Sequence, residues 1–332
     1  MATANHLKAL LRSHADGDDE RFYAVALQMA AQEARLGHTK FALELRELVD
    51  SAQKRTGGMV APRQRPIPIV QPQGELAGLL NIIYPDSRLS EMVLDDELRK
   101  QIEHVVIEQR QREQLKEGGF EPQRKLLLVG PPGTGKTMTA RVLAGELGLP
   151  LFTIQIDGLI TKFLGETAAK LRLIFEAIAR SRALYFFDEF DALGGERGAR
   201  NDVAEIRRVL NSFLQFLEQD QSESLIVAAT NHPDLLDRAL FRRFDAVIEY
   251  VLPTPEVAAL VMRSRLSMFD TSEIDWAKVT AATTGLSHAD AVRCSDHAAK
   301  KAILERTTRI NNVDLMKAVQ VRHSMHGRNK RK

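Results

Sequence analysis

A glycine-rich segment that ends in a lysine and a threonine, GPPGTGKT, runs from Gly130 to Thr137. Its spacing fits G-x-x-x-x-G-K-[ST], a pattern typical of loops that bind phosphate groups. Gly133 and Gly135 would let backbone N–H groups turn inward around anionic oxygens, because glycine has no Cβ to obstruct the turn. Lys136 would reach the β- and γ-phosphates of a nucleotide, and the Thr137 hydroxyl would ligate Mg²⁺. An apolar run before the segment and a helical pattern after it favour this interpretation over an unrelated glycine-rich turn.

Two adjacent carboxylates, Asp188 and Glu189, follow the apolar run ALYFF. If that run is a buried strand, its carboxyl end delivers both side chains to the edge where open α/β sheets bind ligands. Asp188 suits the ligand shell of a magnesium ion, and Glu189 can polarise an attacking water molecule. A solvated turn is the alternative for an isolated Asp-Glu pair, but the phosphate-loop pattern favours the catalytic interpretation.

Short apolar runs alternate with amphipathic helical segments after residue 76, which predicts buried parallel strands separated by helices. The helical spacing i, i+3, i+4, i+7 is clearest at Leu171, Ile174, Phe175 and Ile178. The expected strands are Lys125–Val129, Leu151–Gln155, Ala183–Phe187, Leu225–Ala229 and Ala246–Leu252.

A proline-rich stretch, Pro62 to Gly74, is typical of an extended linker. The helical periodicity before it predicts a small all-α bundle. From Pro253 onward strand patterns disappear, and Ser287-x-x-Asp290 predicts a capping box. The predicted domains are residues 1–56 (helical bundle for a substrate or adaptor), 57–75 (linker), 76–252 (nucleotide-binding α/β domain), 253–325 (helical lid) and 326–332 (basic tail).

The 332 residues carry 46 Lys and Arg against 44 Asp and Glu, a formal net charge of +2. This balance excludes a strongly basic protein that coats nucleic acid and an acidic disordered protein. The single cysteine, Cys294, excludes an internal disulfide, and the scattered histidines leave no zinc cluster to propose. No apolar run approaches the roughly 20 residues that cross a bilayer, and the first residues lack a signal-peptide core, so we expect a cytoplasmic protein without membrane contact.

These residues resemble those of the AAA+ ATPases, and specifically the branch that contains the protein-remodelling AAA proteins. The resemblance covers roughly residues 76–325. It implies the α/β fold of a P-loop NTPase, with a five-stranded parallel sheet and a helical lid. It also implies a ring, most often a hexamer, that binds ATP and Mg²⁺ at its subunit interfaces.

Two further segments match motifs of this family. Asn231 follows the apolar strand LIVAA and Thr230, as the family's sensor residue does, so it would help to orient the water between Glu189 and the γ-phosphate. The segment LFRRFD resembles the arginine-finger segment, which implies that Arg242 and Arg243 reach the neighbour's site and stabilise charge on the transferring phosphoryl group. Many relatives have two residues between these arginines, and their adjacency here leaves open which one is the finger and which one braces it.

The same resemblance implies the residues around the nucleotide. Residues 92–94 would line the adenine pocket together with Ala289 of the lid, and burial in the core is the alternative for these apolar side chains. The lid segment GLSHAD resembles the family's G-x-S-G-A-D, with His288 where a glycine is common. The nucleotide-contacting set that we expect is Pro132, Gly133, Thr134, Gly135, Lys136, Thr137, Met138, Met92, Val93 and Ala289.

The segment Thr161–Glu166, TKFLGE, resembles the aromatic-hydrophobic-glycine pore loop of the remodelling branch. In a ring, copies of Phe163, with Leu164 beside it, would line the axial channel and grip an extended polypeptide. Packing in a local core is the alternative for Phe163. The glycine-rich stretch Gly194–Asp202 is a candidate for a second, outer pore loop.

Two classes of function remain open. The first is an ATP-driven protein unfoldase or remodeller. The second is a nucleic-acid-acting motor or loader, which the basic residues between 322 and 332 support although the whole chain is not basic. Glu189 counts against a third class, a nucleotide-gated scaffold, because a pure switch needs no residue that activates water.

The N-terminal sequence is also similar to that of small bacterial AAA ATPases encoded beside a subtilisin-like serine protease in plasmid-stability and phage-defence loci. That resemblance implies a separate protease as a partner. The chain itself has neither a G-x-S-x-G nucleophile elbow nor an H-E-x-x-H zinc site.

Overall fold

The computed structural model of the chain describes residues 26, 78–159, 164–193, 200–236 and 238–329. Contacts between residues divide the chain into two units, Met1–Ile67 and Pro68–Lys332. All of the described residues except Ala26 belong to the second unit. The helical bundle predicted for residues 1–56 and most of the linker that follows it therefore lie outside the described residues and remain predictions.

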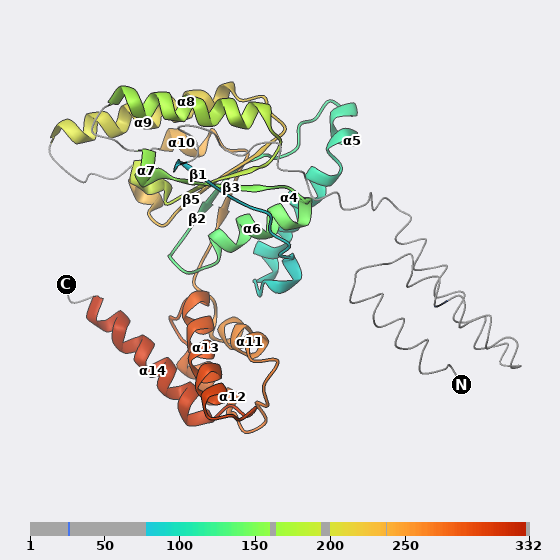
Figure 1. The fold of residues 1–332 in the computed structure, drawn as a ribbon, viewed down its shortest axis with the longest axis vertical. Helices are drawn as coiled ribbons and strands as arrows, with labels where there is room; N and C mark the ends of the chain where they lie inside the picture. Colours follow the sequence, from blue (N-terminus) through green and yellow to red (C-terminus); the bar gives the residue numbers. More distant parts are fainter. Residues whose placement is uncertain (1–25, 27–77, 160–163, 194–199, 237, 330–332) are drawn as a thin grey trace, which may run out of the picture. The chain divides into compact units, whose positions relative to one another are not determined.

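A six-stranded sheet forms the centre of the second unit, with the strand order β1-β3-β4-β5-β2-β6 (Figure 1). Neighbouring strands in the series β3-β4-β5-β2-β6 pair in parallel. These five strands confirm the parallel sheet predicted from the apolar runs. The predicted number of five strands was wrong, because β1 adds an antiparallel edge next to β3. β1 has only four residues, LNII, and this is too short an apolar run to indicate a strand by itself. The strands are β1 (Leu80–Ile83), β2 (Lys125–Val129), β3 (Leu151–Gln155), β4 (Leu184–Asp188), β5 (Leu225–Thr230) and β6 (Ala246–Glu249).

The last strand, β6, ends at Glu249 and not at Leu252 as predicted. Its partner is β2, and Val129 at the end of β2 pairs with Glu249. The Tyr250 N–H still donates to the Val129 oxygen at 2.7 Å, but beyond Val129 the chain of β2 turns into the phosphate loop, so the strand pairing ends there.

Helices cover both faces of the sheet, as Figure 1 shows. The helices between the strands are α4 (Asp96–Arg110), α5 (Arg112–Glu117), α6 (Lys136–Leu147), α7 (Ile156–Leu159), α8 (Leu164–Arg180), α9 (Arg200–Gln219) and α10 (Arg238–Phe241). Helices α8 and α9 share an apolar core with Leu127 and Val129 of β2, whereas α4 and α6 share one with Leu126 and Leu128. Successive residues of a strand point to opposite faces, so the four residues of β2 after Lys125 must all be apolar to fit between two helical layers.

Among the described residues, four helices follow the last strand: α11 (Pro255–Arg265), α12 (Trp276–Ala282), α13 (His288–Leu304) and α14 (Asn312–Asn329). The Thr254 side chain caps α11, with Pro255 at its first position. Ser287 and Asp290 form the predicted capping box at the start of α13. These four helices enclose an apolar core of their own, which includes Cys294. No helix in the described part of the chain is both long and apolar enough to span a bilayer.

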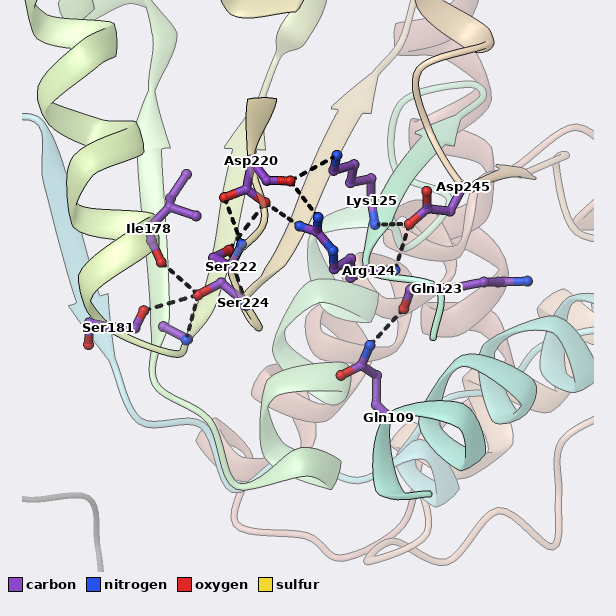
Figure 2. A network of polar contacts seen from close by, with 11 residues as sticks. Gln109, Gln123, Arg124, Lys125, Ile178, Ser181, Asp220, Ser222, Ser224 and Asp245 are labelled. Atoms are coloured by element: carbon purple, nitrogen blue, oxygen red, sulfur yellow. Dashed lines mark hydrogen bonds and ion pairs between the residues drawn. The ribbon is translucent and has the colours of Figure 1, made fainter. Parts of the chain in front are cut away.

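The buried carboxylate of Asp220 organises a polar network at the amino ends of the parallel strands (Figure 2). Arg124, immediately before β2, forms an ion pair with Asp220. Ser224, immediately before β5, donates to the backbone oxygens of Ile178 and Ser181 at 3.1 and 3.0 Å. Partnered polar groups of this kind fix the arrangement of a core. The network therefore ties β2, β5 and the end of α8 together at the edge opposite the phosphate loop.

Candidate functional site

The carboxyl ends of β2, β4 and β5 meet at one edge of the sheet, because the three strands are parallel and β5 lies between the other two. The phosphate loop follows β2, Asp188 ends β4, and Asn231 follows β5. Three segments that are far apart in the sequence are thus gathered at one edge. Asn231 follows the strand that lies between β2, which leads into the phosphate loop, and β4, which ends in Asp188.

Thr137 and Asp188 are in direct contact. The Thr137 Oγ1 donates a hydrogen bond to the Asp188 Oδ2 at 3.1 Å. Hydroxyl and carboxylate oxygens are ligands that Mg²⁺ accepts, and in nucleotide sites this ion takes most of its other ligands from phosphate and water. The contacting pair therefore fits the magnesium site that the sequence predicts.

Lys136 is only 7% exposed, and its Nζ donates to the backbone oxygens of Gly130 and Pro131 at 2.7 and 2.8 Å. Burial lowers the pKa of Lys136 to about 8, an effect that the nearby Asp188 and Asp191 carboxylates partly oppose. The ammonium group is thus held inside the loop by two carbonyl oxygens. Phosphate oxygens are stronger partners for a cation, so the loop is arranged to accept an anionic ligand.

The glycines of the loop adopt backbone conformations that residues with a side chain rarely adopt. Gly133 has a φ of +77° and Gly135 a φ of +110°. A Cβ atom at Gly133 would lie 2.7 Å from Ser287 Oγ, so the loop approaches the lid closely at this point. Thr134 is buried and its Oγ1 donates to the Pro131 oxygen at 2.8 Å. These features fix the turn at the start of α6, whose N-terminus favours anions.

Glu189 has its backbone in the left-handed region, with a φ of 52°, although it is not a glycine. The residue is exposed, and its backbone N–H donates to Asp188 Oδ1 at 3.0 Å. Such a conformation is strained for a residue with a Cβ and is found most often at functional sites. The turn separates two adjacent carboxylates, because Asp188 is tied to Thr137 while Glu189 stays exposed.

Asp191 also belongs to this site, although the sequence patterns did not point to it. Its Oδ1 accepts hydrogen bonds from Thr230 Oγ1 at 3.0 Å and from the backbone N–H of Asn231 at 3.2 Å. The carboxylate therefore fixes the segment after β5 against the segment after β4. The only signal in the sequence is a second Asp shortly after Asp188, where the turn after the strand keeps it at the same edge.

The residues predicted for the base pocket come from two segments, residues 92–94 and the start of α13, and both lie close to the phosphate loop. The Ala289 N–H donates to the Gly133 oxygen at 2.9 Å, which ties the start of α13 to the phosphate loop. Met92 lies against α6, where its Sδ is 4.0 Å from Thr139 Oγ1, and Val93 packs against the core of the lid helices. The two remaining predicted contacts are Pro132, which is exposed, and Met138, which is half-buried.

Comparison with known proteins agrees with this geometry. The family described as "ATPase family associated with various cellular activities (AAA)" matches residues 126–252. The uncharacterized AAA family ATPase y4kL of Sinorhizobium fredii is 35% identical over 322 residues, which cover 96% of this chain and 95% of that protein. This chain belongs to the AAA ATPase family.

Two other relatives of this AAA ATPase have activities in their names. The ATP-dependent zinc metalloprotease FtsH 1 of Methylacidiphilum infernorum is 36% identical over 233 residues, which cover 68% of this chain and 37% of that protein. The proteasome-activating nucleotidase of Pyrococcus horikoshii is 32% identical over 295 residues, which cover 84% of this chain and 73% of that protein. The chain thus spans little more than a third of the metalloprotease and about three quarters of the nucleotidase.

The two adjacent arginines of this AAA ATPase have different environments. Arg243 is half-buried and forms an ion pair with Glu218 of α9. Arg242 is exposed, and within the described ranges it forms neither a hydrogen bond nor an ion pair. In the same ranges, no contact joins either arginine to the Thr137–Asp188 pair. Among the described residues, neither arginine therefore belongs to the hydrogen-bonded cluster around the phosphate loop of its own chain.

The predicted pore residues are not among those that the structure describes. Phe163 and residues 194–199 lie outside the described ranges, and the last three residues of the predicted outer loop, 200–202, belong to α9 and not to a loop. Leu164 is the first residue of α8, but its side chain also lies outside them. The assignment of Phe163 and Leu164 to a central pore remains a prediction.

Proposed function

We propose that this AAA ATPase forms a ring, a hexamer in its simplest form, in which each ATP site is completed by a neighbouring subunit and hydrolysis moves a protein client. The observation that carries the proposal is the exposure of Arg242 beside the paired Arg243. An exposed guanidinium that has no partner among the described residues is available to the site of a neighbour. Repeated head-to-tail contacts of this kind form a ring when the rotation between successive subunits closes.

The chain's own residues would bind the triphosphate. Lys136 and the backbone N–H groups of the loop would hold the β- and γ-phosphates, and the N-terminus of α6 adds a partial positive charge. Thr137 and Asp188 would hold Mg²⁺, which when bound supplies charge that offsets the charge of the phosphates. The hydrogen bond of 3.1 Å between these two side chains supports this assignment.

Glu189 would act as the general base. It is the carboxylate that follows Asp188 directly and is not tied to Thr137, so it can accept a proton from the attacking water. Asn231 would orient the same water, and Asp191 would hold Asn231 in place through the backbone. A positioned general base contributes typically 10²–10⁴-fold to the rate.

Arg242 would act as the finger and Arg243 as its brace. The ion pair with Glu218 holds Arg243 to α9 of its own subunit, whereas Arg242 can extend toward the triphosphate of the next subunit. A guanidinium there stabilises the charge that develops on the transferred phosphoryl group. Hydrolysis would then depend on assembly of the ring.

A protein client is favoured over a nucleic acid. The names of two relatives, a metalloprotease and a proteasome-activating nucleotidase, refer to proteolysis, and the pore-loop resemblance around Phe163 supports a polypeptide in the channel. The given sequence contains neither the G-x-S-x-G nor the H-E-x-x-H motif. A separate protease, such as the subtilisin-like enzyme implied by the N-terminal resemblance, would then supply cleavage.

A substrate-trapping experiment tests this function. The Glu189→Gln variant with ATP should retain the client in a pull-down, whereas Lys136→Ala, which should not hold the triphosphate, is the matched control. In parallel, unfolded protein should stimulate the ATPase rate of the wild type. Stimulation by single-stranded DNA and not by unfolded protein would instead support a nucleic-acid motor.

A further inference from the structure

Tyr250 is the first residue after β6 and begins the segment that leads to α11 of the lid. Its N–H donates to the Val129 oxygen at 2.7 Å, which places it beside the last residue before the phosphate loop. A Cβ atom on Gly130 would lie 2.1 Å from the Tyr250 carbonyl oxygen, and Gly130 has a φ of +144°. The Tyr250 backbone therefore packs directly against the first residue of the loop, where a side chain has no room.

The side chain of Tyr250 reaches the other end of the same loop. Tyr250 is only 2% exposed, and its Oη lies 2.6 Å from Oγ1 of Thr139, which is buried in the first turn of α6. Thr139 Oγ1 is also 3.2 Å from the Gly135 oxygen, a stronger acceptor than the Met92 sulfur at 4.0 Å. A carbonyl oxygen can only accept, and a hydroxyl has one hydrogen to give, so Thr139 donates to Gly135 and Tyr250 donates to Thr139. Burial raises the pKa of the Tyr250 hydroxyl, which therefore keeps its hydrogen at neutral pH.

The peptide group between Gly135 and Lys136 is held from the side of the helix. The Gly135 oxygen accepts from the Thr139 N–H at 2.9 Å as well as from the Thr139 hydroxyl, so two hydrogen bonds fix its direction. Because a trans peptide is planar, the Lys136 N–H points away from the Gly135 oxygen and out of the start of α6. That N–H is one of the backbone donors that the proposed function assigns to the phosphates. The hydrogen-bond chain from Tyr250 through Thr139 therefore sets the direction of a donor in the loop.

We propose that Tyr250 is a positioning residue for phosphate binding. Its backbone fixes the start of the phosphate loop at Gly130, and its hydroxyl, through Thr139, fixes the N–H of Lys136 at the end of the loop. This inference rests on the proposed function, because it requires the loop to bind the phosphates of ATP. The alternative is a tyrosine whose hydroxyl contributes only to the stability of the core, and its loss would then leave phosphate binding unchanged.

A matched pair of tyrosine variants distinguishes the two roles. Tyr250→Phe removes only the hydroxyl near the loop. Tyr185→Phe removes another buried hydroxyl, which donates to the Ala177 and Ser181 oxygens at 3.0 and 3.2 Å in the core that α8 and α9 share with the sheet. Calorimetry of the full chain in EDTA, which prevents hydrolysis, gives the affinities for inorganic tripolyphosphate and for ATP. We expect Tyr250→Phe to bind both about 3- to 10-fold more weakly, the value of one hydrogen bond, and Tyr185→Phe to bind both like the wild type.

Variants of Thr139 test the same chain of hydrogen bonds from its middle. Thr139→Val removes both hydrogen bonds of this hydroxyl, so it should weaken tripolyphosphate binding at least as much as Tyr250→Phe does. The double variant should bind no more weakly than Thr139→Val alone. Thr139→Ser keeps the hydroxyl and should bind like the wild type. Melting curves identify a temperature at which every variant is folded, so that a loss of stability does not enter the measured affinities.

The inference is overturned if Tyr250→Phe binds tripolyphosphate like the wild type, or if Tyr185→Phe loses as much affinity as Tyr250→Phe. It is also overturned if the losses of Tyr250→Phe and Thr139→Val multiply in the double variant, or if Thr139→Ser binds as weakly as Thr139→Val. If the wild type binds neither tripolyphosphate nor ATP, the proposed phosphate site itself is wrong. That result concerns the wild type alone, so it is distinct from a failure of the role of Tyr250.

Discussion

Arg243 forms an ion pair with Glu218 of α9, whereas the neighbouring Arg242 is exposed and unpaired within the described residues. The two arginines are identical in type and adjacent in sequence, so only their surroundings distinguish them. An ion pair on a half-buried side chain restricts its motion, and this restriction suits a residue that positions its neighbour. The exposed arginine keeps the freedom to contact another subunit.

Arg242→Ala should lower the kcat of the assembled ATPase by about 10³-fold, because an arginine finger stabilises charge that exists only in the transition state. Its melting temperature should stay that of the wild type, since an exposed and unpaired side chain contributes little to stability. Steady-state phosphate release and differential scanning calorimetry measure the two quantities. A variant with nearly the wild-type kcat would show that Arg242 is not the finger.

Glu218→Gln should reproduce the effect of Arg243→Ala, because either change removes the same ion pair. Displacing a catalytic group by about 1 Å can cost up to about 10²-fold, so we expect both variants to lose kcat with little change in KM. The double variant should be no slower than Arg243→Ala alone. If the two losses multiply, the residues act independently and the bracing role is wrong.

Glu189→Gln should keep the affinity for ATP and lose about 10²–10⁴-fold in hydrolysis, because glutamine has nearly the same shape but cannot accept the proton of the water. Equilibrium binding of ATP and single-turnover hydrolysis check the two parts separately. Asp188→Asn is the matched control. It should instead bind Mg²⁺ more weakly and so raise the Mg²⁺ concentration that half-maximal activity requires. Unimpaired turnover by Glu189→Gln would rule out its role as the base.

Asp191→Ala should lower kcat without changing the affinity for ATP. The Asp191 Oδ1 accepts from Thr230 Oγ1 and from the Asn231 N–H, so its loss frees the segment that carries Asn231. Thr230→Val leaves the hydrogen bond from the Asn231 N–H in place and should have the smaller effect. Measuring kcat and Kd for the two variants tests which change costs more activity. Equal kcat for Asp191→Ala and the wild type would remove Asp191 from the site.

Cys294 should be nearly inert toward thiol reagents in the folded chain. Cys294 is 1% exposed, and burial raises the pKa of its thiol from 9.0 to about 11. Since the thiolate is the reactive form, raising the pH from 7 to 9 should produce far less thiolate than for a free cysteine. The time course of labelling, with the guanidinium-unfolded chain as control, measures this. Rapid labelling at pH 8 would contradict a closed core around α13.

Much of the fold follows from patterns that are local in the sequence. The five parallel strands coincide with apolar runs, because a strand between two helical layers is apolar on both faces. The capping box at Ser287 and the helix that starts at Lys136 are also local features, and the structure confirms both. The short edge strand β1 has no such signal, since its position depends on pairing with β3.

In the candidate site too, residues that form a local pattern could be predicted, whereas residues whose role depends on a distant segment could not. The phosphate-loop segment and the Asp188–Glu189 pair are recognisable because their chemistry lies in consecutive residues. Asp191 escaped prediction, because its role depends on a hydrogen bond to the segment after another strand. Arg242 and Arg243 differ because only Arg243 forms an ion pair with Glu218. Glu218 lies on another helix, so the sequence pattern does not show which of the two arginines it contacts.

The central claim, that neighbouring subunits share each ATP site, is tested most directly by mixing two inactive variants. Glu189→Gln subunits keep Arg242 but lack the base, and Arg242→Ala subunits keep Glu189 but lack the finger. In randomly mixed equimolar rings, about a quarter of the interfaces combine an intact base with an intact finger, so ATPase activity should return to about a quarter of the wild-type rate. A mixture as inactive as its two components would contradict the claim.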